Sequence, residues 1–499
     1  MYIMQGKTCK NVDKEAISKF KIPSIVLMEN AAEGIYREIS DMGEVYTVIC
    51  GTGNNGGDGL AVGRKLLLSG KEVNFIIINP IEKYSTDFKI NLEIVKNISK
   101  NISYIKDIND IKDTSLIISK SNVIIDAIFG IGLNRAIDDL HNEIIEIVNN
   151  SKKTIIAVDV PSGLDCNEGI ALGNAIRANY TYTFEVIKRG FINYSAFEYL
   201  GEMKVISIGI PEEIKANNSE KIYMLEKKDY RDMIKDRKIY GHKGDYGKAI
   251  IFAGSMGFTG AAYITTEACV KSGAGLVTLV TTTECQKILS SKLVEAMTAN
   301  YAEKEKILEL INKATAIAFG PGIGNAKEFE EILLWIVENS TATIIIDAEG
   351  INILSRRADI LKKLSGRAIL TPHPGEMSKL IGKSIDDIEK DRVNIARTFA
   401  KENQCILLLK GFNTVITNGD EVIINNSGNS KMASGGMGDC LTGIITALVS
   451  QGYDGFIATK FAAYVHGITG ENQGENKFSI IASDVIDNIS NNINSIIIN

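Results

Sequence analysis

One short stretch near the start of the chain restricts the possible folds more than any other. Residues 45–50, VYTVIC, form an apolar run of strand length, and the sequence GTGNNGGDG follows at once at 51–59. The next residues, LAVGRKLLLSG, have the period of a helix. A strand, a glycine-rich turn and a helix in this order form the opening unit of a doubly wound α/β fold.

The same order of elements recurs along the first part of the chain. Alternating strands and helices predict a mostly parallel sheet that is buried on both faces. The expected fold class is therefore α/β, with a Rossmann-like doubly wound sheet in the N-terminal part. The further strands expected there are residues 73–78, 122–129, 154–160, 180–186 and 203–208.

The stretch from residue 211 to residue 240 is charged and shows no strong period, and the strand and helix pattern then restarts with KAIIFA. We therefore predict an N-terminal domain at 1–215, a linker region at 216–239 and a second α/β domain at 240–499. Within the second domain, apolar runs again end in charged residues, such as TIIID at Asp347.

The overall composition excludes some functional classes. The chain has 499 residues with 55 basic and 61 acidic side chains, a net charge of −6, which argues against a general nucleic-acid-binding surface. Its seven cysteines are scattered without a CxxC pair, which predicts buried thiols in a reducing cytoplasm. The start of the chain lacks the apolar region of a signal peptide, and no apolar run reaches membrane-spanning length. We expect a cytoplasmic protein without a membrane partner.

A first candidate site follows from the ends of the N-terminal strands, because ligands of doubly wound sheets bind at the carboxyl ends of the strands. The groups found there are GTGNNGGDG, Asp126 with GIGLNR, and Asp159 with PSGLD. Asn55, Asp126 and Ser162 offer hard oxygens, which suit an alkali or other hard cation better than zinc. Asp159 is a further carboxylate for acid/base chemistry. The alternative is that both aspartates only cap the helices that follow them.

A second candidate site lies at MASGGMGDCLTG, residues 432–443. Gly435, Gly436 and Gly438 allow successive N–H groups to converge on an anion at a helix N-terminus. Asp439 is a carboxylate beside this anion site. Its position makes sense if it takes a proton from a hydroxyl while the N–H groups hold the phosphate that the hydroxyl attacks. The alternative is a plain glycine-rich helix start.

Two other motifs in the second domain contain candidate site residues, His373 in the first and Lys410 in the second, and a purely structural histidine is the alternative for His373. TPHPGE, residues 371–376, holds His373 between two prolines, which fix an extended loop. KGFNT, residues 410–414, offers Lys410 as a point charge and Thr414 as a hydroxyl for nucleotide phosphates. An exposed lysine without a ligand is the alternative interpretation of Lys410.

The N-terminal motifs resemble the NAD(P)H-hydrate epimerase family. The resemblance is carried by IPSIVLMENAA, GTGNNGGDG with a following Arg64, GIGLNR and VDVPSGLD. It implies that Asn55, Asp126 and Ser162 bind a potassium ion and that Asp159 contacts the substrate as candidate acid/base. It also implies interconversion of the R and S epimers of hydrated NAD(P)H. The residues implied to bind this substrate are Asn54, Asn55, Gly56, Gly57, Asp58, Gly130, Ile131, Gly132, Leu133, Asn134, Arg135 and Asp159.

The C-terminal motifs resemble the ADP-dependent NAD(P)H-hydrate dehydratase family, which has a ribokinase-like fold. The resemblance implies that Gly322 and His373 contact hydrated NAD(P)H, that Asp439 meets the substrate hydroxyl and that magnesium bridges the phosphates. Met437 departs from the family pattern, which usually has a small residue there. The residues implied to line the adenine nucleotide are Lys410, Gly411, Phe412, Asn413, Thr414 and Gly438.

Taken as a whole, the chain resembles bifunctional enzymes that carry the epimerase domain first and the dehydratase domain second. The resemblance implies repair of hydrated NADH and NADPH, with ADP converted to AMP and phosphate, and we also expect a homo-oligomer. Two alternatives stay open. The second domain could be a small-molecule kinase whose phosphorylated product persists, and the first could be a non-catalytic binding module. The preference for ADP or ATP and for NADH or NADPH also stays open.

Overall fold

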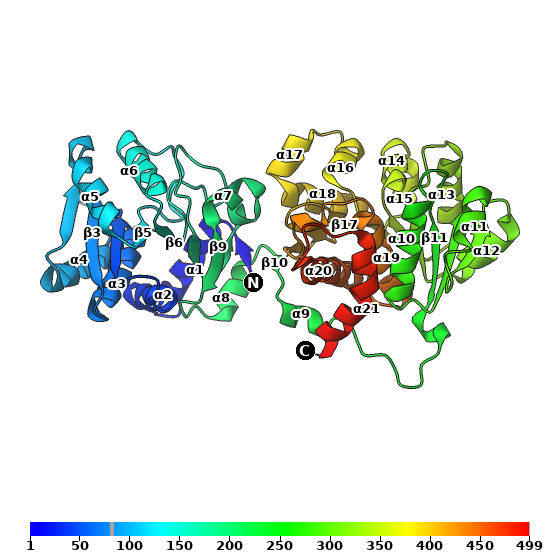
Figure 1. Cartoon of the computed structure of the whole chain (residues 1–499), viewed down its shortest axis with the longest axis horizontal. Coiled ribbons are helices and arrows are strands. Elements are labelled where there is room, and N and C mark those ends of the chain that lie inside the picture. Colours follow the sequence, from blue (N-terminus) through cyan, green and yellow to red (C-terminus); the bar gives the residue numbers. More distant parts are fainter. Residues whose placement is uncertain (80–83, 499) are drawn as a thin grey trace. The chain divides into compact units, whose positions relative to one another are not determined.

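The computed structural model describes residues 1–79 and 84–498, and it divides into two units, Met1–Ile222 and Tyr223–Asn499 (Figure 1). The stretch 216–239, which we expected as a linker region, contains regular structure. It holds the end of α8 (Glu212–Asn218), the strand β10 (Ile222–Met224) and the short helix α9 (Lys227–Arg231).

The first unit is built on a seven-stranded sheet in which every neighbouring pair is parallel. This confirms the α/β class and all six strands expected from the sequence. The order reverses between β2 and β5, which is the switch point where doubly wound sheets bind ligands. In sheet order the strands are β4 (Ile102–Ile105), β3 (Glu72–Ile78), β2 (Val45–Cys50), β5 (Val123–Ala127), β6 (Thr154–Val158), β7 (Tyr180–Phe184) and β9 (Glu202–Ile206).

Two cores lie on the two faces of this sheet. Along β2, Tyr46, Val48 and Cys50 pack into one core and Ile49 into the other, because successive strand side chains alternate between faces. The first core is closed by α2 (Ser24–Ile39), α3 (Asn54–Leu68) and α4 (Thr86–Ile98), and the second by α5 (Ile111–Lys120) and α6 (Asp139–Asn150).

A two-stranded parallel sheet anchors the start of the chain beside the end of the main sheet. β1 (Ile3–Met4) pairs with β8 (Ile187–Lys188), so that Met4 lies opposite Lys188. The helix α1 (Gly6–Ser18) follows β1 directly, and its buried side packs with Val186 and Ile208. After β8 the chain passes through the short helix α7 (Phe197–Leu200) into β9.

The second unit contains a ten-stranded mixed sheet. Its strands from β17 to β13 in sheet order are parallel, whereas β18 and β19 form an antiparallel hairpin. The order reverses between β14 and β11. In sheet order the strands are β10, β19 (Val422–Asn425), β18 (Thr414–Thr417), β17 (Ile406–Leu409), β16 (Ala368–Leu370), β15 (Thr343–Ile346), β14 (Ala316–Phe319), β11 (Lys248–Phe252), β12 (Leu276–Thr281) and β13 (Met297–Asn300).

Helices cover both faces of this second sheet, as Figure 1 shows. The glycine at position 443 lets α19 cross α10 closely, since a Cβ there would lie 2.3 Å from the carbonyl oxygen of Thr265. The helices are α10 (Thr259–Lys271), α11 (Thr283–Leu289), α12 (Lys304–Lys313), α13 (Glu328–Asn339), α14 (Glu349–Arg356), α15 (Ala358–Lys363), α16 (Pro374–Ile381), α17 (Ile385–Lys390), α18 (Arg392–Asn403), α19 (Met437–Ser450), α20 (Gly455–Gly474) and α21 (Ala482–Ile498). Across the residues that the structure describes, none of the helices has the length and apolar character to cross a bilayer.

Candidate active sites

The three oxygen-bearing side chains predicted at the first site lie together at the switch point. The Ser162 hydroxyl donates to Asp126 Oδ1 at 2.6 Å, and the Ser162 amide donates to Asp126 Oδ2 at 2.8 Å. Asn55 Nδ2 donates to the carbonyl oxygen of Phe129 at 2.9 Å, and the Phe129 amide donates to Ser162 Oγ at 2.9 Å. The ends of β2, β5 and β6 are therefore joined in one network of oxygen atoms.

The donor set of this network fits a hard monovalent cation. Asp126 is fully buried, and burial raises its pKa to about 6. A cation would compensate this buried carboxylate, and the hydroxyl, amide and carbonyl oxygens beside it are the neutral ligands that hard cations prefer. Neither Asp126 nor Asp159 caps a helix. The next helix after Asp126 is α6, which is capped by Asp138, and no α-helix begins between residues 159 and 188, all of which the structure describes.

Most glycines of GTGNNGGDG allow close packing, whereas the sequence indicated that they allow a ligand to approach the backbone. Gly56, Gly57 and Gly59 fall in the first turns of α3, where a Cβ at Gly56 would lie 1.9 Å from the carbonyl oxygen of Gly51. At Gly59 a Cβ would lie 2.4 Å from Ala127 Cβ. Gly53 alone among these has open space at the Cβ position. Close approach of a ligand to the backbone is therefore possible at Gly53, whereas the helical glycines let α3 lie against the sheet.

Asp159 lies in a different environment from Asp126. It follows β6 with a φ of 63°, a conformation that is uncommon for a residue with a side chain and is often found at functional sites. Its Oδ1 accepts from Thr183 Oγ1 and the Phe184 amide, both at 3.1 Å, and from Lys188 Nζ at 2.6 Å. Lys188 is buried, and no sequence pattern indicates it because it lies on a two-residue strand.

The other residues implied to bind the first substrate lie at the start of α3 and in the loop after β5. Gly130 lies against Asn55, since a Cβ there would be 3.2 Å from the Asn55 side chain. Burial and the nearby charges of Asp159 and Asp13 raise the pKa of Asp58 well above its usual value. The exposed members of the set are Asn54, Gly132, Asn134 and Arg135, and the half-buried members are Asn55, Asp58, Gly130, Ile131 and Leu133.

At the second site, the glycine-rich turn leads into α19 as expected. Gly436 adopts a φ of 91° and precedes the first helical residue, Met437. A Cβ at Gly438 would lie 3.4 Å from Lys410 Nζ and 3.7 Å from Asp347 Oδ2. The N-terminus of α19, with its inward-pointing amides and partial positive charge, therefore faces a lysine and a buried carboxylate.

Lys410 is held at the end of β17 by carboxylates that the sequence did not single out. Its Nζ lies 2.7 Å from Asp347 Oδ1 and 4.0 Å from Glu376 Oε2. Thr442 donates to Asp347 Oδ2 at 2.8 Å. Asp347 follows a buried strand directly, and this position could have indicated a site residue. No motif surrounds Asp347, so the sequence alone did not indicate a role for it.

Asp439 is the remaining carboxyl group at this helix start. Burial raises its pKa to about 6, and the negative charge of Asp347 adds to the shift while Lys410 opposes it. A carboxylate with this pKa is a stronger base than an ordinary aspartate and is still largely ionised near neutral pH.

His373 has a capping role besides any contact with substrate. Its Nδ1 accepts from the Gly375 amide at 3.0 Å, and Glu376 Oε2 accepts from the His373 amide at 2.9 Å, so the two residues cap α16 reciprocally. Burial and the nearby Lys410 lower the pKa of His373. Because Nδ1 is an acceptor, the neutral ring carries its proton on Nε2, and the side chain is 56% exposed. Nε2 lies 3.4 Å from Glu376 Oε1, so a ligand that accepts from Nε2–H would take the place of this carboxylate oxygen.

The KGFNT loop is fixed by an arginine that the sequence did not indicate. Arg392 is buried and donates to the carbonyl oxygens of Leu409 and Lys410, both at 3.0 Å. Its guanidinium lies 2.9 Å from where a Cβ of Gly411 would be, and Gly411 has a φ of 140°. Thr414 Oγ1 donates to the carbonyl oxygen of Gly411 at 2.9 Å.

Gly322 lies at the switch point of the second sheet. It follows β14 with a φ of 63°, and its carbonyl oxygen accepts from Ser255, which follows β11, at 2.8 Å. The strand ends that carry Gly322, His373 and Lys410 belong to parallel strands and therefore meet at one edge of the sheet.

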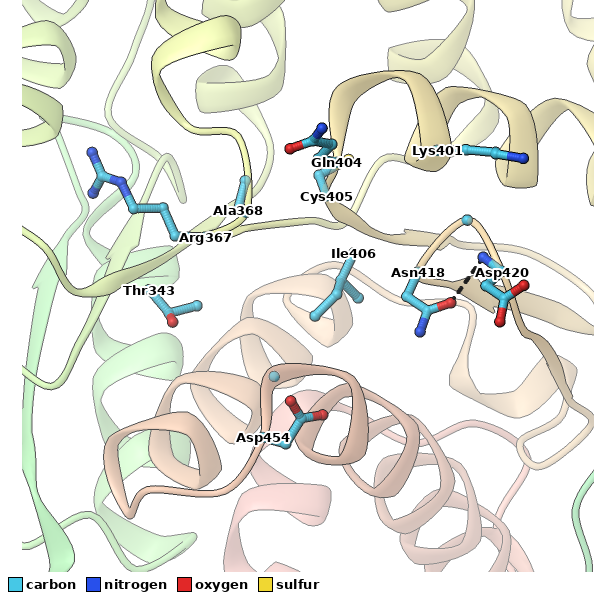
Figure 2. A pocket seen from close by; sticks show the side chains of 13 residues that line it. Thr343, Arg367, Ala368, Lys401, Gln404, Cys405, Ile406, Asn418, Asp420 and Asp454 are labelled. Atoms are coloured by element: carbon cyan, nitrogen blue, oxygen red, sulfur yellow. Dashed lines mark hydrogen bonds between the residues drawn. The ribbon is translucent and has the colours of Figure 1, made fainter.

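A cavity of about 450 Å³ lies at the opposite, amino-terminal edge of this sheet (Figure 2). Two of its charged groups already have structural roles: Arg367 donates to the carbonyl oxygens of Ser340 and Val337, and Asp454 caps α20. Asn418 accepts from the Asp420 amide across the hairpin turn. No predicted site residue lines this cavity, so neither candidate site depends on it.

Comparison with known proteins identifies the two parts of the chain. Residues 24–190 match the family model described as YjeF-related protein N-terminus, and residues 249–492 match the model described as NAD(P)H-hydrate dehydratase. The bifunctional NAD(P)H-hydrate repair enzyme Nnr of Moorella thermoacetica is 34% identical over 98% of this chain and 96% of its own length.

Solved structures resemble the second unit. A ribokinase-like superfamily protein of Enterococcus faecalis aligns with a TM-score of 0.52 and 24% identity over 55% of this chain and 96% of its own, which confirms the ribokinase-like fold. The ADP/ATP-dependent NAD(P)H-hydrate dehydratase of Bacillus subtilis, co-crystallized with ATP/Mg²⁺, is 27% identical over 55% of this chain and 98% of its own, with a TM-score of 0.48. Because the similarity to the Moorella enzyme extends over both units, this chain belongs to the family of bifunctional NAD(P)H-hydrate repair enzymes, with an N-terminal epimerase domain and a C-terminal dehydratase domain.

Proposed function

We propose that the first unit interconverts the R and S epimers of hydrated NADH and NADPH, and that the second unit dehydrates the S epimer while ADP is converted to AMP and phosphate. The observation that carries the proposal is the position of Asp439 at the amide-rich start of α19, beside Lys410. A base, a phosphate-binding helix end and a cation at one place suit attack of a hydroxyl on a phosphate.

In the second unit, the residues divide the work as follows. Gly322 and His373 Nε2–H hold the hydrated nicotinamide, and Lys410 with the Gly438 amide holds the nucleotide phosphates. Asp439 takes the proton of the ring hydroxyl as its oxygen bonds to the terminal phosphorus of ADP and AMP leaves. The original ring carbon–oxygen bond then breaks with phosphate as the leaving group, the adjacent ring carbon loses a proton to water, and the ring double bond returns.

Magnesium would supply charge compensation for the phosphates at this site. Glu376 fits as an oxygen ligand, because burial raises its pKa to about 7 and a cation would stabilise its ionised form. In the first unit, Asn55, Asp126 and Ser162 fit a potassium ion that would neutralise the buried Asp126.

The function is tested by supplying the R epimer of hydrated NADH with ADP and following NADH absorbance and phosphate release. We expect NADH to be recovered with stoichiometric release of phosphate. A phosphorylated product that persists would instead identify the second unit as a kinase. Recovery from the S epimer but not from the R epimer would identify the first unit as a binding module.

The dehydratase rate should depend on pH through Asp439. The group must be ionised to accept a proton, and its pKa is raised to about 6. We therefore expect the rate with the S epimer to increase as the pH rises from 5 to 7 and then to level off. A rate that is flat over this range would contradict the assignment of Asp439 as the base.

The epimerase rate should depend on potassium. With Ser162 replaced by alanine, Asp126 loses one hydroxyl donor and the cation loses one ligand, so we expect the potassium requirement to increase roughly 10–100-fold. The measurements are conversion of the R epimer at increasing KCl, with NaCl as reference, and the shift of the unfolding temperature with KCl. Ser151→Ala, at the far end of β6, is the matched control. Equal response of both variants to KCl would remove Ser162 from the site.

Three further expectations from the sequence remain proposals. They are a homo-oligomeric assembly, a cytoplasmic setting and domain limits at 1–215 and 240–499. The cytoplasmic setting is supported by seven cysteines that are all buried and unpaired. Size measurement in solution tests the assembly.

A further inference from the structure

The three polar groups of Lys410 are held by three different parts of the second unit. Its amide donates to the carbonyl oxygen of Pro372 at 2.9 Å, and its ammonium pairs with Asp347 at 2.7 Å. Its carbonyl oxygen accepts from Arg392 Nη2 at 3.0 Å. Pro372 and Asp347 follow the neighbouring strands β16 and β15, whereas Arg392 is the first residue of α18. The arginine therefore reaches the KGFNT loop from a helix and not from a strand end.

Arg392 holds the main chain at the end of β17. Its Nη2 donates to the carbonyl oxygens of both Leu409 and Lys410 at 3.0 Å, and its Nη1 lies 2.8 Å from Glu389 Oε1. The N–H groups of a guanidinium have fixed directions in one plane, so these bonds set the direction of the chain where it leaves the strand. The arginine side chain is 7% exposed, and it therefore acts on a ligand through the loop and not by contact.

The glycine at position 411 lets the arginine come this close. A Cβ at Gly411 would lie 2.9 Å from both Nη1 and Nη2 of Arg392, and the φ of Gly411 is 140°, in the region that favours glycine. Thr414 Oγ1 then donates to the carbonyl oxygen of Gly411 at 2.9 Å. Residues 410–414 therefore form a loop of defined shape that is fixed from its first residue.

This loop carries two groups that suit an adenine nucleotide. The ammonium of Lys410 lies 3.4 Å from where a Cβ of Gly438 would be, at the amide-rich start of α19. Phe412 is 45% exposed, and an exposed aromatic ring suits stacking on a flat base. Both groups follow the main chain that Arg392 holds, so a shift of the chain at residue 410 would displace both.

We propose that Arg392 is a positioning residue of the dehydratase, which fixes the main chain at residues 409–411 so that Lys410 and Phe412 meet ADP in a loop that is already ordered. The proposal rests on the dehydratase function proposed above. It assigns Arg392 to the binding of ADP and not to the binding of hydrated NAD(P)H, whose proposed contacts, Gly322 and His373, follow other strands.

The expected size of the effect follows from the order of the loop. A ligand that binds an ordered loop does not have to supply the free energy of ordering it. Fixing the backbone of a single residue corresponds to roughly 10-fold in affinity, so loss of Arg392 should weaken ADP binding by about this factor or more. The rate at saturating ADP should change little, because Asp439 and the Gly438 amide belong to α19 and not to the loop.

The kinetic test supplies the full chain with the S epimer of hydrated NADH and follows NADH absorbance while ADP or the epimer is varied. Arg392→Met removes both bonds to the loop, and we expect the KM for ADP to increase roughly 10-fold or more. The kcat and the KM for the S epimer should stay close to those of the wild-type protein. Arg356→Met, which removes an exposed arginine paired with Glu330 and Glu349 on its own side of α14, is the matched control and should change none of these values.

Hydrogen exchange of the amides of residues 410–414 measures the loop itself. Without ADP, these amides should exchange faster in Arg392→Met than in the wild-type protein, and saturating ADP should slow them again. Arg392→Lys keeps the positive charge but has a single nitrogen in place of the planar guanidinium. It should therefore be intermediate both in the exchange of these amides and in the KM for ADP.

Gly411→Ala tests the same contact from the loop side. The added Cβ would displace the guanidinium of Arg392, so we expect the same selective increase in the KM for ADP. Gly366→Ala is the matched control, because Gly366 also has a positive φ, of 81°, but has open space at its Cβ position. This exposed glycine lies at the opposite edge of the sheet, and its substitution should leave the KM for ADP unchanged.

The outcomes separate this inference from the proposed function. If the wild-type protein does not recover NADH from the S epimer with ADP, the dehydratase function itself fails. If the wild-type protein is active and Arg392→Met raises the KM for ADP and for the S epimer by the same factor, the arginine is structural only. If Arg392→Lys keeps the wild-type KM while its loop amides exchange as fast as in Arg392→Met, the arginine acts through its charge and the positioning role is wrong. A wild-type KM for ADP in Gly411→Ala would also contradict that role, and this variant decides if Arg392→Met does not fold.

Discussion

Asp439→Asn should stop recovery of NADH from both epimers of hydrated NADH. Asparagine keeps the shape of the side chain but cannot accept the hydroxyl proton, so the rate should fall roughly 10²–10⁴-fold. Both epimers must pass through the second unit, which is why the loss should be equal for the two. The measurement is NADH absorbance with each purified epimer and saturating ADP.

The same substitution, Asp439→Asn, should not weaken the binding of ADP. The carboxylate lies beside the amides and the lysine that we propose as the phosphate site, and its negative charge would oppose an anionic ligand. Asp439→Asn should therefore bind ADP at least as tightly as the wild-type protein in calorimetry. Asp487→Asn, an exposed residue of α21 that pairs with Lys271, is the matched control and should change neither quantity. Loss of ADP binding in Asp439→Asn would show a structural role instead of a chemical one.

The sequence predicted those parts of the fold that depend on buried central strands. Residues 45–50 and 343–347 are continuous apolar runs because both faces of their strands are covered. The edge strand β4, ISYI, is largely half-buried or exposed and carries no such run, and the edge strand β13, MTAN, is similar. Edge strands are defined by the neighbour that they pair with, which a local pattern does not contain.

Some residues of the candidate sites could be predicted from the sequence and others could not. Asp126 and Ser162 could be predicted to meet because both follow parallel strands, whose carboxyl ends share one edge of the sheet. Lys188 could not, since its place depends on the pairing of two-residue strands 184 positions apart, Met4 with Lys188. From the sequence we expected the glycines of α3 to lie close to a ligand. A glycine motif shows that side chains are absent, but it does not show which neighbouring atoms fill the space that they leave.

Asp159→Asn should impair the epimerase activity of the chain and leave the dehydratase activity intact. The epimerase would lose its candidate acid/base group, and Lys188 would keep a buried ammonium with no carboxylate to compensate it. We expect use of the R epimer to fall roughly 10²–10⁴-fold, because that substrate must first be converted to the S epimer. Use of the S epimer should be unchanged, since Asp159 belongs to the first unit and Asp439 to the second.

The matched control for this division is Asp165→Asn, which leaves Asp159 and Lys188 in place and alters a turn where Asp165 accepts from the Asn167 amide at 2.7 Å. Because the epimers also interconvert spontaneously, the rate without protein is subtracted from each measurement.

The double variant Asp159→Asn with Lys188→Met removes both charges of the buried pair. It should unfold at a higher temperature than Asp159→Asn alone and still fail to use the R epimer, because the candidate acid/base group is absent. Equal loss with both epimers in Asp159→Asn would contradict the division of labour, and recovery of R-epimer use in the double variant would show that Asp159 only neutralises Lys188.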